Sequence, residues 1–152
     1  MATFLFDNII FGPIKSRRLG HSLGINILPS NSKLCNYNCI YCECGFSKIY
    51  DYDAIPNVNQ YKELLEKELI RIVKNKIEVN ALTFAGNGEP TIHPEFSEII
   101  DETILLRDKY LKNVDIVVLT NATRLNDNEI CQSLNKIDKE TITIDSLTDK
   151  NA

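Results

Sequence analysis

Four cysteines within ten residues are the part of this sequence best suited to chemistry. Cys35, Cys39 and Cys42 follow a C-x3-C-x2-C spacing, and Cys44 comes two residues later. In a reducing compartment, thiolates this close together are more often metal ligands than disulfide partners. Three of them can surround one corner of an iron–sulfur cluster and leave one iron without a local ligand. The alternative is a structural zinc site that uses all four, although the spacing from Cys42 to Cys44 is unusually tight for zinc.

Two further stretches place small and polar residues at the ends of predicted strands. Residues 86–90 read G-N-G-E-P, in which the glycines let the backbone approach a ligand and Glu89 offers an acceptor for an ammonium group. Thr120 and Asn121 follow the next predicted strand, where an Asn side chain can also simply close a turn. The carboxyl ends of parallel strands meet at one edge of a sheet, so we expect these stretches to lie near the cysteines.

These motifs, in this order, resemble the radical S-adenosylmethionine (SAM) superfamily. The resemblance implies a [4Fe-4S] cluster whose fourth iron stays open for SAM. It also implies that the second motif holds the methionine end of SAM, with Asn87 standing where the family has a second glycine. Expected metal ligands are Cys35, Cys39 and Cys42, and expected cofactor-binding residues are Tyr41 beside the adenine, Gly86, Asn87, Gly88 and Glu89 at the methionine, and Thr120 and Asn121 near the ribose or carboxylate.

The run from Phe11 to Gly45 extends the resemblance to a subgroup, the Fe-S oxidoreductases related to wyosine-tRNA biosynthesis enzymes. The resemblance implies an oxidoreductase in which the reduced cluster cleaves SAM to methionine and a 5′-deoxyadenosyl radical, which abstracts hydrogen from a substrate. Its partners would be SAM, an external one-electron reductant and a substrate that is RNA, protein or a small molecule. It assigns no catalytic residue. Two alternatives stay open: a small activase of glycyl-radical enzymes, and a non-catalytic zinc or iron–sulfur module.

Other polar residues allow more than one interpretation. Three residues near the N-terminus could hold the cluster loop, a phosphate or a carboxylate, or could be solvated. A histidine after the second motif could line the cavity or be structural, and an aspartate near the C-terminus could face the site or end a strand. Cys44 is a spare thiol, a substrate-side group or a ligand in a damaged cluster. The three N-terminal residues are Ser16, Arg17 and Arg18, the histidine is His93 and the aspartate is Asp145. We expect His21 to be a loop or structural histidine rather than a ligand, and Cys131 to lie in the core.

Composition places the chain among ordinary globular domains. It has 152 residues, 43% hydrophobic and 25% charged, with a net charge of −4 and a pI of about 5.2. This argues against an extended nucleic-acid surface. The sequence has no apolar run of membrane-spanning length and no signal-peptide pattern, so we expect a cytoplasmic protein without a membrane segment.

Alternating strand and helix patterns predict an α/β fold with a parallel sheet, a partial (β/α) barrel of about three and a half units. We expect one domain over 1–152, with an N-terminal arm and loop at 1–23, a β/α core at 24–146 and a tail at 147–152. Expected strands are 24–29, 81–85, 115–120 and 141–145; expected helices are 58–74, 94–112 and 127–135, the last capped by Asn126. The resemblance implies six units in a full barrel, so the chain is a shortened form, a fragment, or a homo-oligomer that completes its barrel.

Overall fold

The computed structural model describes residues 4–47 and 54–142. Its elements in chain order are β1 (Ile10–Ser16), β2 (Gly20–Ile25), α1 (Val58–Lys74), β3 (Ala81–Phe84), the 3-10 helix η2 (Pro90–Ile92), α2 (Phe96–Tyr110), β4 (Asp115–Thr120), α3 (Asn128–Leu134) and β5 (Lys139–Ile142).

The described strands form one five-stranded sheet in the order β1-β2-β3-β4-β5. From β2 to β5 every pairing is parallel, and Leu23, Leu82 and Ile116 lie side by side in register. Helices connect these parallel strands, so each connection is a β-α-β unit. The α/β prediction is therefore confirmed for the described residues. The domain bounds at 1–152 stay a prediction.

The first two strands differ from the sequence prediction. A loop is predicted over 16–24, but β1 and β2 form an antiparallel hairpin that turns at Arg17–Leu19. Only Gly24 and Ile25 of the strand predicted at 24–29 lie in β2, which begins at Gly20 and ends at Ile25, so the prediction is wrong for residues 26–29. The glycines and serines of this stretch are typical of a loop, yet Gly24 lies within β2. A glycine is needed at this strand position because the Phe11 ring occupies the space that a Cβ would take.

Smaller corrections concern helix ends and the last strand. Helix α3 is capped by Asp127, whose side chain accepts the Glu129 amide, and not by Asn126. Strand β5 begins two residues before the predicted start at Thr141. Asp145 and the predicted tail lie outside the described residues.

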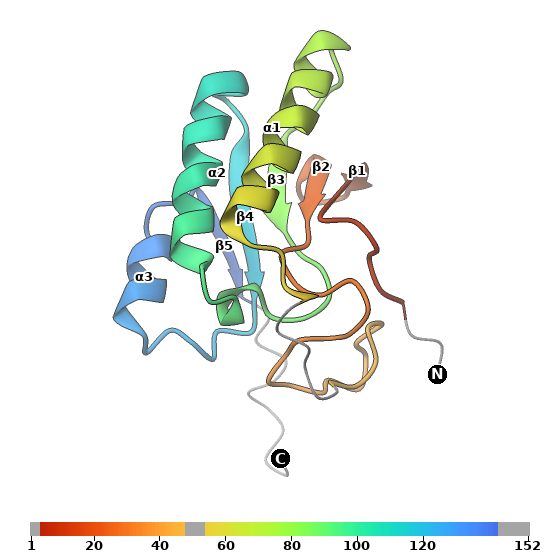
Figure 1. The fold of residues 1–152 in the computed structure, drawn as a ribbon, viewed down its shortest axis with the longest axis vertical. Coiled ribbons are helices and arrows are strands. Elements are labelled where there is room, and N and C mark those ends of the chain that lie inside the picture. The colour runs from red at the N-terminus through yellow and green to blue at the C-terminus, as the bar shows by residue number, and fades with distance from the viewer. Residues whose placement is uncertain (1–3, 48–53, 143–152) are drawn as a thin grey trace.

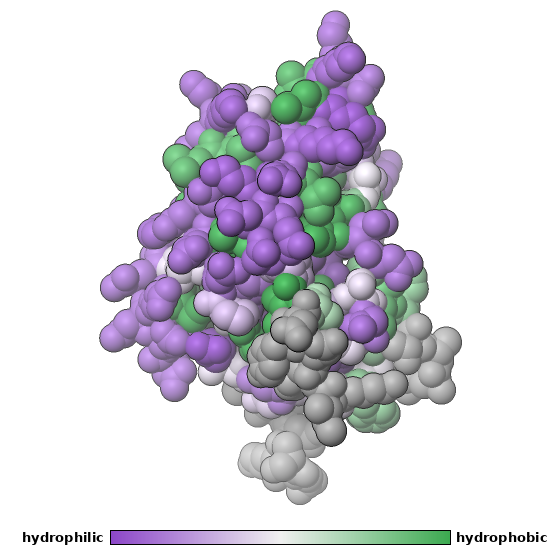
Figure 2. All heavy atoms as spheres, viewed as in Figure 1, coloured by the Kyte–Doolittle hydropathy of each residue, from purple (hydrophilic) through white to green (hydrophobic). Residues whose placement is uncertain are grey.

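The helices cover one face of the sheet and bury its apolar side chains. Figure 1 shows α1 and α2 side by side in front of the strands, with α3 beside α2. Leu65 and Leu69 of α1 are fully buried in the same core as Leu82 and Phe84 of β3. The outer surfaces of these helices are mainly hydrophilic in Figure 2. This packing fixes the strands and so fixes where their carboxyl ends point.

The cysteine loop lies at the carboxyl ends of the parallel strands. In Figure 1 the orange segment after β2 passes below the arrowheads of β2, β3 and β4, and the loops after β3 and β4 turn at the same edge. The N-terminal arm reaches this edge as well, since the Phe4 amide donates to the Glu43 carbonyl over 2.8 Å. The topology thus gathers the predicted motifs at one end of the sheet.

Candidate functional site

One cavity of about 370 Å³ brings together the three predicted motifs. Such a volume is within the range of small-molecule sites in proteins. Its walls come from the cysteine loop, from the loop after β3, from the end of β4 and from the N-terminal arm. The predicted residues among its lining are Cys35, Cys39, Tyr41, Cys42, Gly86, Gly88, Glu89, Thr120 and Asn121, and Cys44 joins them.

Two backbone hydrogen bonds join the start of the cysteine loop to the loop after β3. The Leu34 amide donates to the Asn87 carbonyl over 2.8 Å, and the Glu89 amide donates to the Leu34 carbonyl over 2.9 Å. Between them stands Gly88, whose φ of +141° is unfavourable for other residues. A Cβ on Gly88 would lie 1.8 Å from the Leu34 oxygen. Only glycine therefore permits this junction, which lies directly before Cys35.

The thiols of the site lie in a partly buried and reduced environment. None of the five cysteines, all within the described part of the chain, forms a disulfide. Burial raises the pKa of the Cys35 thiol, and burial followed by the neighbouring Cys42 raises the pKa of the Cys44 thiol to about 11. Among residues 4–47 and 54–142, no group of three or more His, Cys, Asp or Glu side chains could hold a metal ion as it stands. The cysteine side chains would therefore have to come closer together to hold a metal ion or cluster, and each ligating thiol would also lose its proton.

Glu89 joins the loop after β3 to the end of β4. Its side chain is buried, and its Oε1 accepts the amide and hydroxyl of Thr91 and the hydroxyl of Thr120, the last over 2.7 Å. Its Oε2 accepts the Asn121 amide over 2.7 Å. Four protein donors thus occupy the carboxylate that the sequence suggested for an ammonium group. Glu89 lines the cavity, but its carboxylate already stabilises the strand ends.

Asn87 is the predicted cofactor-binding residue whose side chain lies away from the cavity. It is fully buried, and its Nδ2 donates to the carbonyls of Phe6 and Pro29 over 2.9 and 2.8 Å. Its Oδ1 accepts the Phe6 amide over 2.8 Å. Asn87 therefore ties the N-terminal arm and the segment after β2 to the loop after β3, and supports the cavity wall from behind.

Thr120 and Asn121 end β4 with contacts to both other motifs. Asn121 donates through Nδ2 to Asn36 Oδ1 over 2.9 Å and lies 3.7 Å from the Cys35 sulfur. Its Oδ1 accepts the amide and hydroxyl of Thr123, which closes the turn that the sequence also allowed. The asparagine therefore closes the turn, as the sequence allowed, and the same side chain contacts the cysteine loop, while its place near the ribose or carboxylate of SAM stays a prediction.

Two residues at this site were missed from the sequence. Asn36 bonds to Asn121 and also donates to Thr123 over 2.6 Å. Lys33 is only 3% exposed and lines the cavity. A lysine is seldom buried, so sequence reasoning expects it in solvent. Its place two residues before Cys35, the first predicted ligand, was the signal that could have found it.

The other candidates lie apart from the cavity. Arg17 and Arg18 are exposed at the hairpin turn. His93 is buried, with Nε2 2.9 Å from the Pro56 carbonyl and Nδ1 accepting the Glu95 amide over 3.0 Å, and is thus structural. Cys131 is partly exposed rather than in the core, and its thiol donates to the Leu125 carbonyl.

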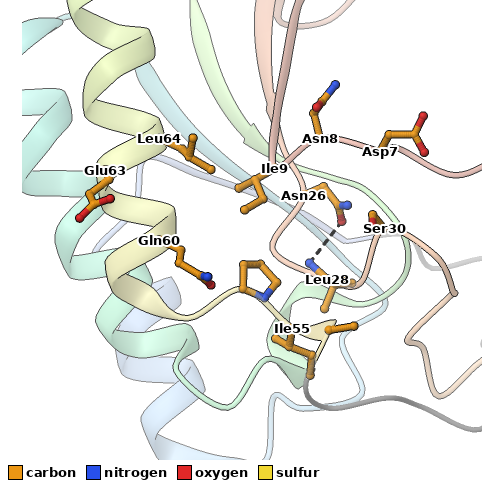
Figure 3. A pocket seen from close by; sticks show the side chains of 12 residues that line it. Asp7, Asn8, Ile9, Asn26, Leu28, Ser30, Ile55, Gln60, Glu63 and Leu64 are labelled. Carbon is orange, nitrogen blue, oxygen red and sulfur yellow. Dashed lines mark hydrogen bonds between the residues drawn. The ribbon is translucent and has the colours of Figure 1, made fainter.

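A larger cavity of about 490 Å³ lies on the other side of the N-terminal arm. Figure 3 shows its lining from four segments: Asp7 to Ile9 of the arm, Asn26 to Ser30 after β2, Ala54 to Pro56 before α1, and Gln60 to Leu64 of α1. The Asn26 side chain there accepts the Leu28 amide over 3.3 Å, the bond drawn in Figure 3. This cavity is lined by no cysteine, so its size does not make it the better candidate.

Comparison with known proteins decides the family. The model of the radical SAM superfamily matches residues 32–151, which include every cysteine. The chain belongs to the radical SAM superfamily. Enzymes of this family carry out radical chemistry with SAM and usually hold a [4Fe-4S] cluster.

Curated relatives extend beyond the part that this chain matches. A UPF0026 protein of Helicobacter pylori is 34% identical over 145 residues, covering 91% of this chain and 43% of that protein. An S-adenosylmethionine-dependent nucleotide dehydratase of Flammeovirga pacifica is 31% identical over 130 residues, covering 82% of this chain and 41% of that protein. The radical SAM chain described here thus spans less than half the length of these relatives.

A solved structure shares the fold. The crystal structure of BtrN in complex with AdoMet and 2-DOIA matches with a TM-score of 0.51 at 18% identity, covering 80% of this chain and 45% of BtrN. At this identity the match concerns the fold alone, and it agrees with the mixed α/β sheet. No helix in the described residues is long and apolar enough to cross a bilayer.

The residues of the radical SAM chain fit a thiolate-bound cluster. Three cysteines from one loop line the same cavity, their thiols are not committed to disulfides, and a buried lysine lies beside them. Soft thiolate ligands are the donors that iron–sulfur clusters require.

Proposed function

We propose that this chain binds a [4Fe-4S] cluster through Cys35, Cys39 and Cys42 and binds SAM in the adjoining cavity. When bound and reduced, the cluster supplies the electron that splits SAM into methionine and a 5′-deoxyadenosyl radical, which abstracts hydrogen from a substrate. The observation that carries the proposal is the convergence of the cysteine loop, the loop after β3 and the end of β4 on one cavity. The electron comes from an external one-electron reductant.

The protein's own part is ligation and placement. The backbone hydrogen bonds between Leu34 and the residues on either side of Gly88 hold the start of the loop, and so place Cys35 at the edge of the sheet. Ligation requires the thiols to lose protons, which burial opposes at Cys35, so the metal itself must drive that loss. Cys44 donates its thiol to the Gly86 carbonyl at 3.6 Å, which supports a cavity-side thiol over a fourth ligand.

We propose that the methionine end of SAM contacts the protein mainly through backbone peptide groups rather than through side chains. Gly86 and Gly88 line the cavity without side chains, so a ligand can reach their peptide groups. The Glu89 carboxylate already accepts four donors, and an ammonium group would have to compete with them. Tyr41 lines the mouth of the cavity and is 56% exposed, a position that suits contact with the adenine.

The substrate is proposed only as a class. One relative is named a nucleotide dehydratase, which makes a nucleotide the first small molecule to try beside RNA and protein substrates. The activase and the non-catalytic module are outcomes of the test below. The site offers no observation that favours either one.

The test is the formation of 5′-deoxyadenosine. Protein loaded anaerobically with iron and sulfide is mixed with dithionite and SAM, and 5′-deoxyadenosine is measured by liquid chromatography and mass spectrometry. We expect product from the wild type and from C131S, because Cys131 lies on α3 outside the cavity. We expect loss of product of at least a hundredfold in C39A. An iron-loaded wild type that leaves SAM intact contradicts the enzymatic proposal, and a protein that takes up zinc but no iron contradicts the cluster.

A further inference from the structure

Lys33 is a buried cation within the cysteine cavity. Its residue is 3% exposed, and it lines the cavity together with the four cysteines of the loop. A lysine is almost never buried to this degree unless its charge is balanced, because moving an ammonium group out of water is costly. Its place in the interior therefore needs a physical reason.

The described residues offer the Lys33 ammonium one hydrogen bond and no ion pair. Its Nζ donates to the Gly45 carbonyl over 3.0 Å. None of the salt bridges among residues 4–47 and 54–142 includes it. The nearby Glu89 already accepts four other donors. An ammonium group has three N–H donors, so two remain for the contents of the cavity.

Lys33 lies in the same cavity as the thiols of Cys35 and Cys44. Burial places the lysine in a region of low effective dielectric, where a charge acts strongly on its neighbours. The groups that would complete its balance are the sulfur atoms of the loop.

The Lys33–Gly45 hydrogen bond also closes the loop. The two residues are twelve positions apart, and Cys35, Cys39, Cys42 and Cys44 all lie between them. Within the loop the Cys42 amide donates to the Cys39 carbonyl and the Gly45 amide to the Cys42 carbonyl. The side chain thus fixes the far end of the loop against its beginning.

We propose that Lys33 is a positioning residue whose ammonium closes the cysteine loop and balances the negative charge of the bound cluster, which raises the reduction potential of that cluster. The inference rests on the proposed function, since it concerns the same cavity. A reduced cluster carries one more negative charge than an oxidised one, so a buried cation beside it favours reduction. Hydrogen bonds and charges around a metal site tune it in this way.

The experiment compares three lysine variants of the full chain. K33M removes the charge and keeps most of the length, and K33R keeps the charge. K112M is the matched control, since Lys112 is exposed just after α2 and its loss changes the net charge equally. Each protein is loaded anaerobically, its iron and sulfide are counted, its folding is checked by circular dichroism, and its midpoint potential is measured by a redox titration followed by EPR.

The expected result separates charge from folding. K33M has a clearly lower potential than the wild type and loses cluster faster to a chelator, while K33R and K112M stay close to the wild type in potential. A potential in K33M equal to that of K112M overturns the inference, because a purely structural lysine would change loading without changing potential. If K33M takes up no cluster and K33R does, the charge is needed and the inference stands. If neither loads, side-chain shape rather than charge is decisive and the inference fails.

Failure of the proposed function gives a different result. If the wild type itself takes up no iron–sulfur cluster, the proposed function falls before any variant is compared. If the wild type loads and cleaves SAM but K33M keeps its potential, only the role of Lys33 is wrong.

Discussion

Some residues of the candidate site support its wall through buried hydrogen bonds, in addition to the residues that line the cavity. Glu89 gathers four donors from two loops, and Asn87 ties the N-terminal arm to the loop after β3. These buried groups are satisfied by several partners each, which is the condition for a rigid polar site. A rigid wall keeps the cysteine loop in one place before a ligand arrives.

Gly88→Ala tests the junction between the cysteine loop and the loop after β3. The new Cβ would meet the Leu34 carbonyl in a backbone conformation that favours glycine. We expect a loss of about 2 to 5 kcal/mol in the free energy of unfolding, measured by denaturant titration, and weaker iron uptake. Gly20→Ala is the control, because its Cβ meets only the Asn80 side chain at the remote hairpin. G20A should lose stability and keep iron uptake; equal iron uptake by G88A and the wild type would show that the junction does not position the cysteines.

At this scale the sequence reveals residue types better than residue roles. Cys35, Cys39 and Cys42, which the spacing predicts to be metal ligands, line one cavity, and their ligation of a metal stays a prediction. The family motif makes Asn87 a lining residue, but a buried carboxamide with three partners is determined by long-range contacts that no local pattern encodes. Lys33 is missed for the converse reason, because burial of a lysine depends on the cavity around it.

The secondary-structure elements were predictable where their periodicity is strong. Helix α1 matches its prediction at both ends, because Asn57 and Gln60 form a capping box that marks its start. Strand β4 also matches, as an almost unbroken apolar run buried on both faces. The β1–β2 hairpin was not predictable from its glycines and serines, since its strands are determined by pairing across the hairpin and with β3.

The pH dependence of stability follows from an element contact at His93. This histidine follows η2, and its ring bridges the Pro56 carbonyl before α1 and the Glu95 amide before α2. Burial lowers the pKa of His93, although the Pro56 carbonyl and Glu95 act in the opposite direction. The unfolded chain, with an ordinary pKa near 6.5, therefore binds a proton more readily than the folded chain.

We therefore expect the His93 contribution to stability to be complete above about pH 6.5 and to be lost as the pH falls toward the lower pKa of the folded state. Denaturant titrations at pH 7.5 and pH 5.5 measure this loss for the wild type and for H93Q and H21Q. H21Q replaces the chain's other histidine, which lies on β2 away from this contact, and serves as the matched control. The loss should be smaller in H93Q; an equal loss in H93Q and the wild type would contradict the assignment.

At the scale of the whole molecule, the chain matches one part of the longer radical SAM relatives, and that part holds the cavity proposed to bind a cluster. The alignment with the Helicobacter pylori relative covers 91% of this chain but only 43% of that protein. Its described strands account for the three and a half units that the sequence predicts. Assembly into a homo-oligomer and the cytoplasmic location stay predictions. The substrate is the least predictable property, because the residues of this cavity are those proposed to bind SAM and the cluster and none of them identifies a substrate.

The most direct measurement is the EPR spectrum of the reduced, reconstituted protein with SAM labelled with ¹⁷O in its carboxylate and ¹⁵N in its amine. An iron left open by Cys35, Cys39 and Cys42 should take both groups of SAM as ligands. The account predicts that SAM changes the cluster signal and that hyperfine coupling to both labels appears in the wild type and in C131S. A cluster signal that SAM leaves unchanged, without coupling to either label, would contradict it.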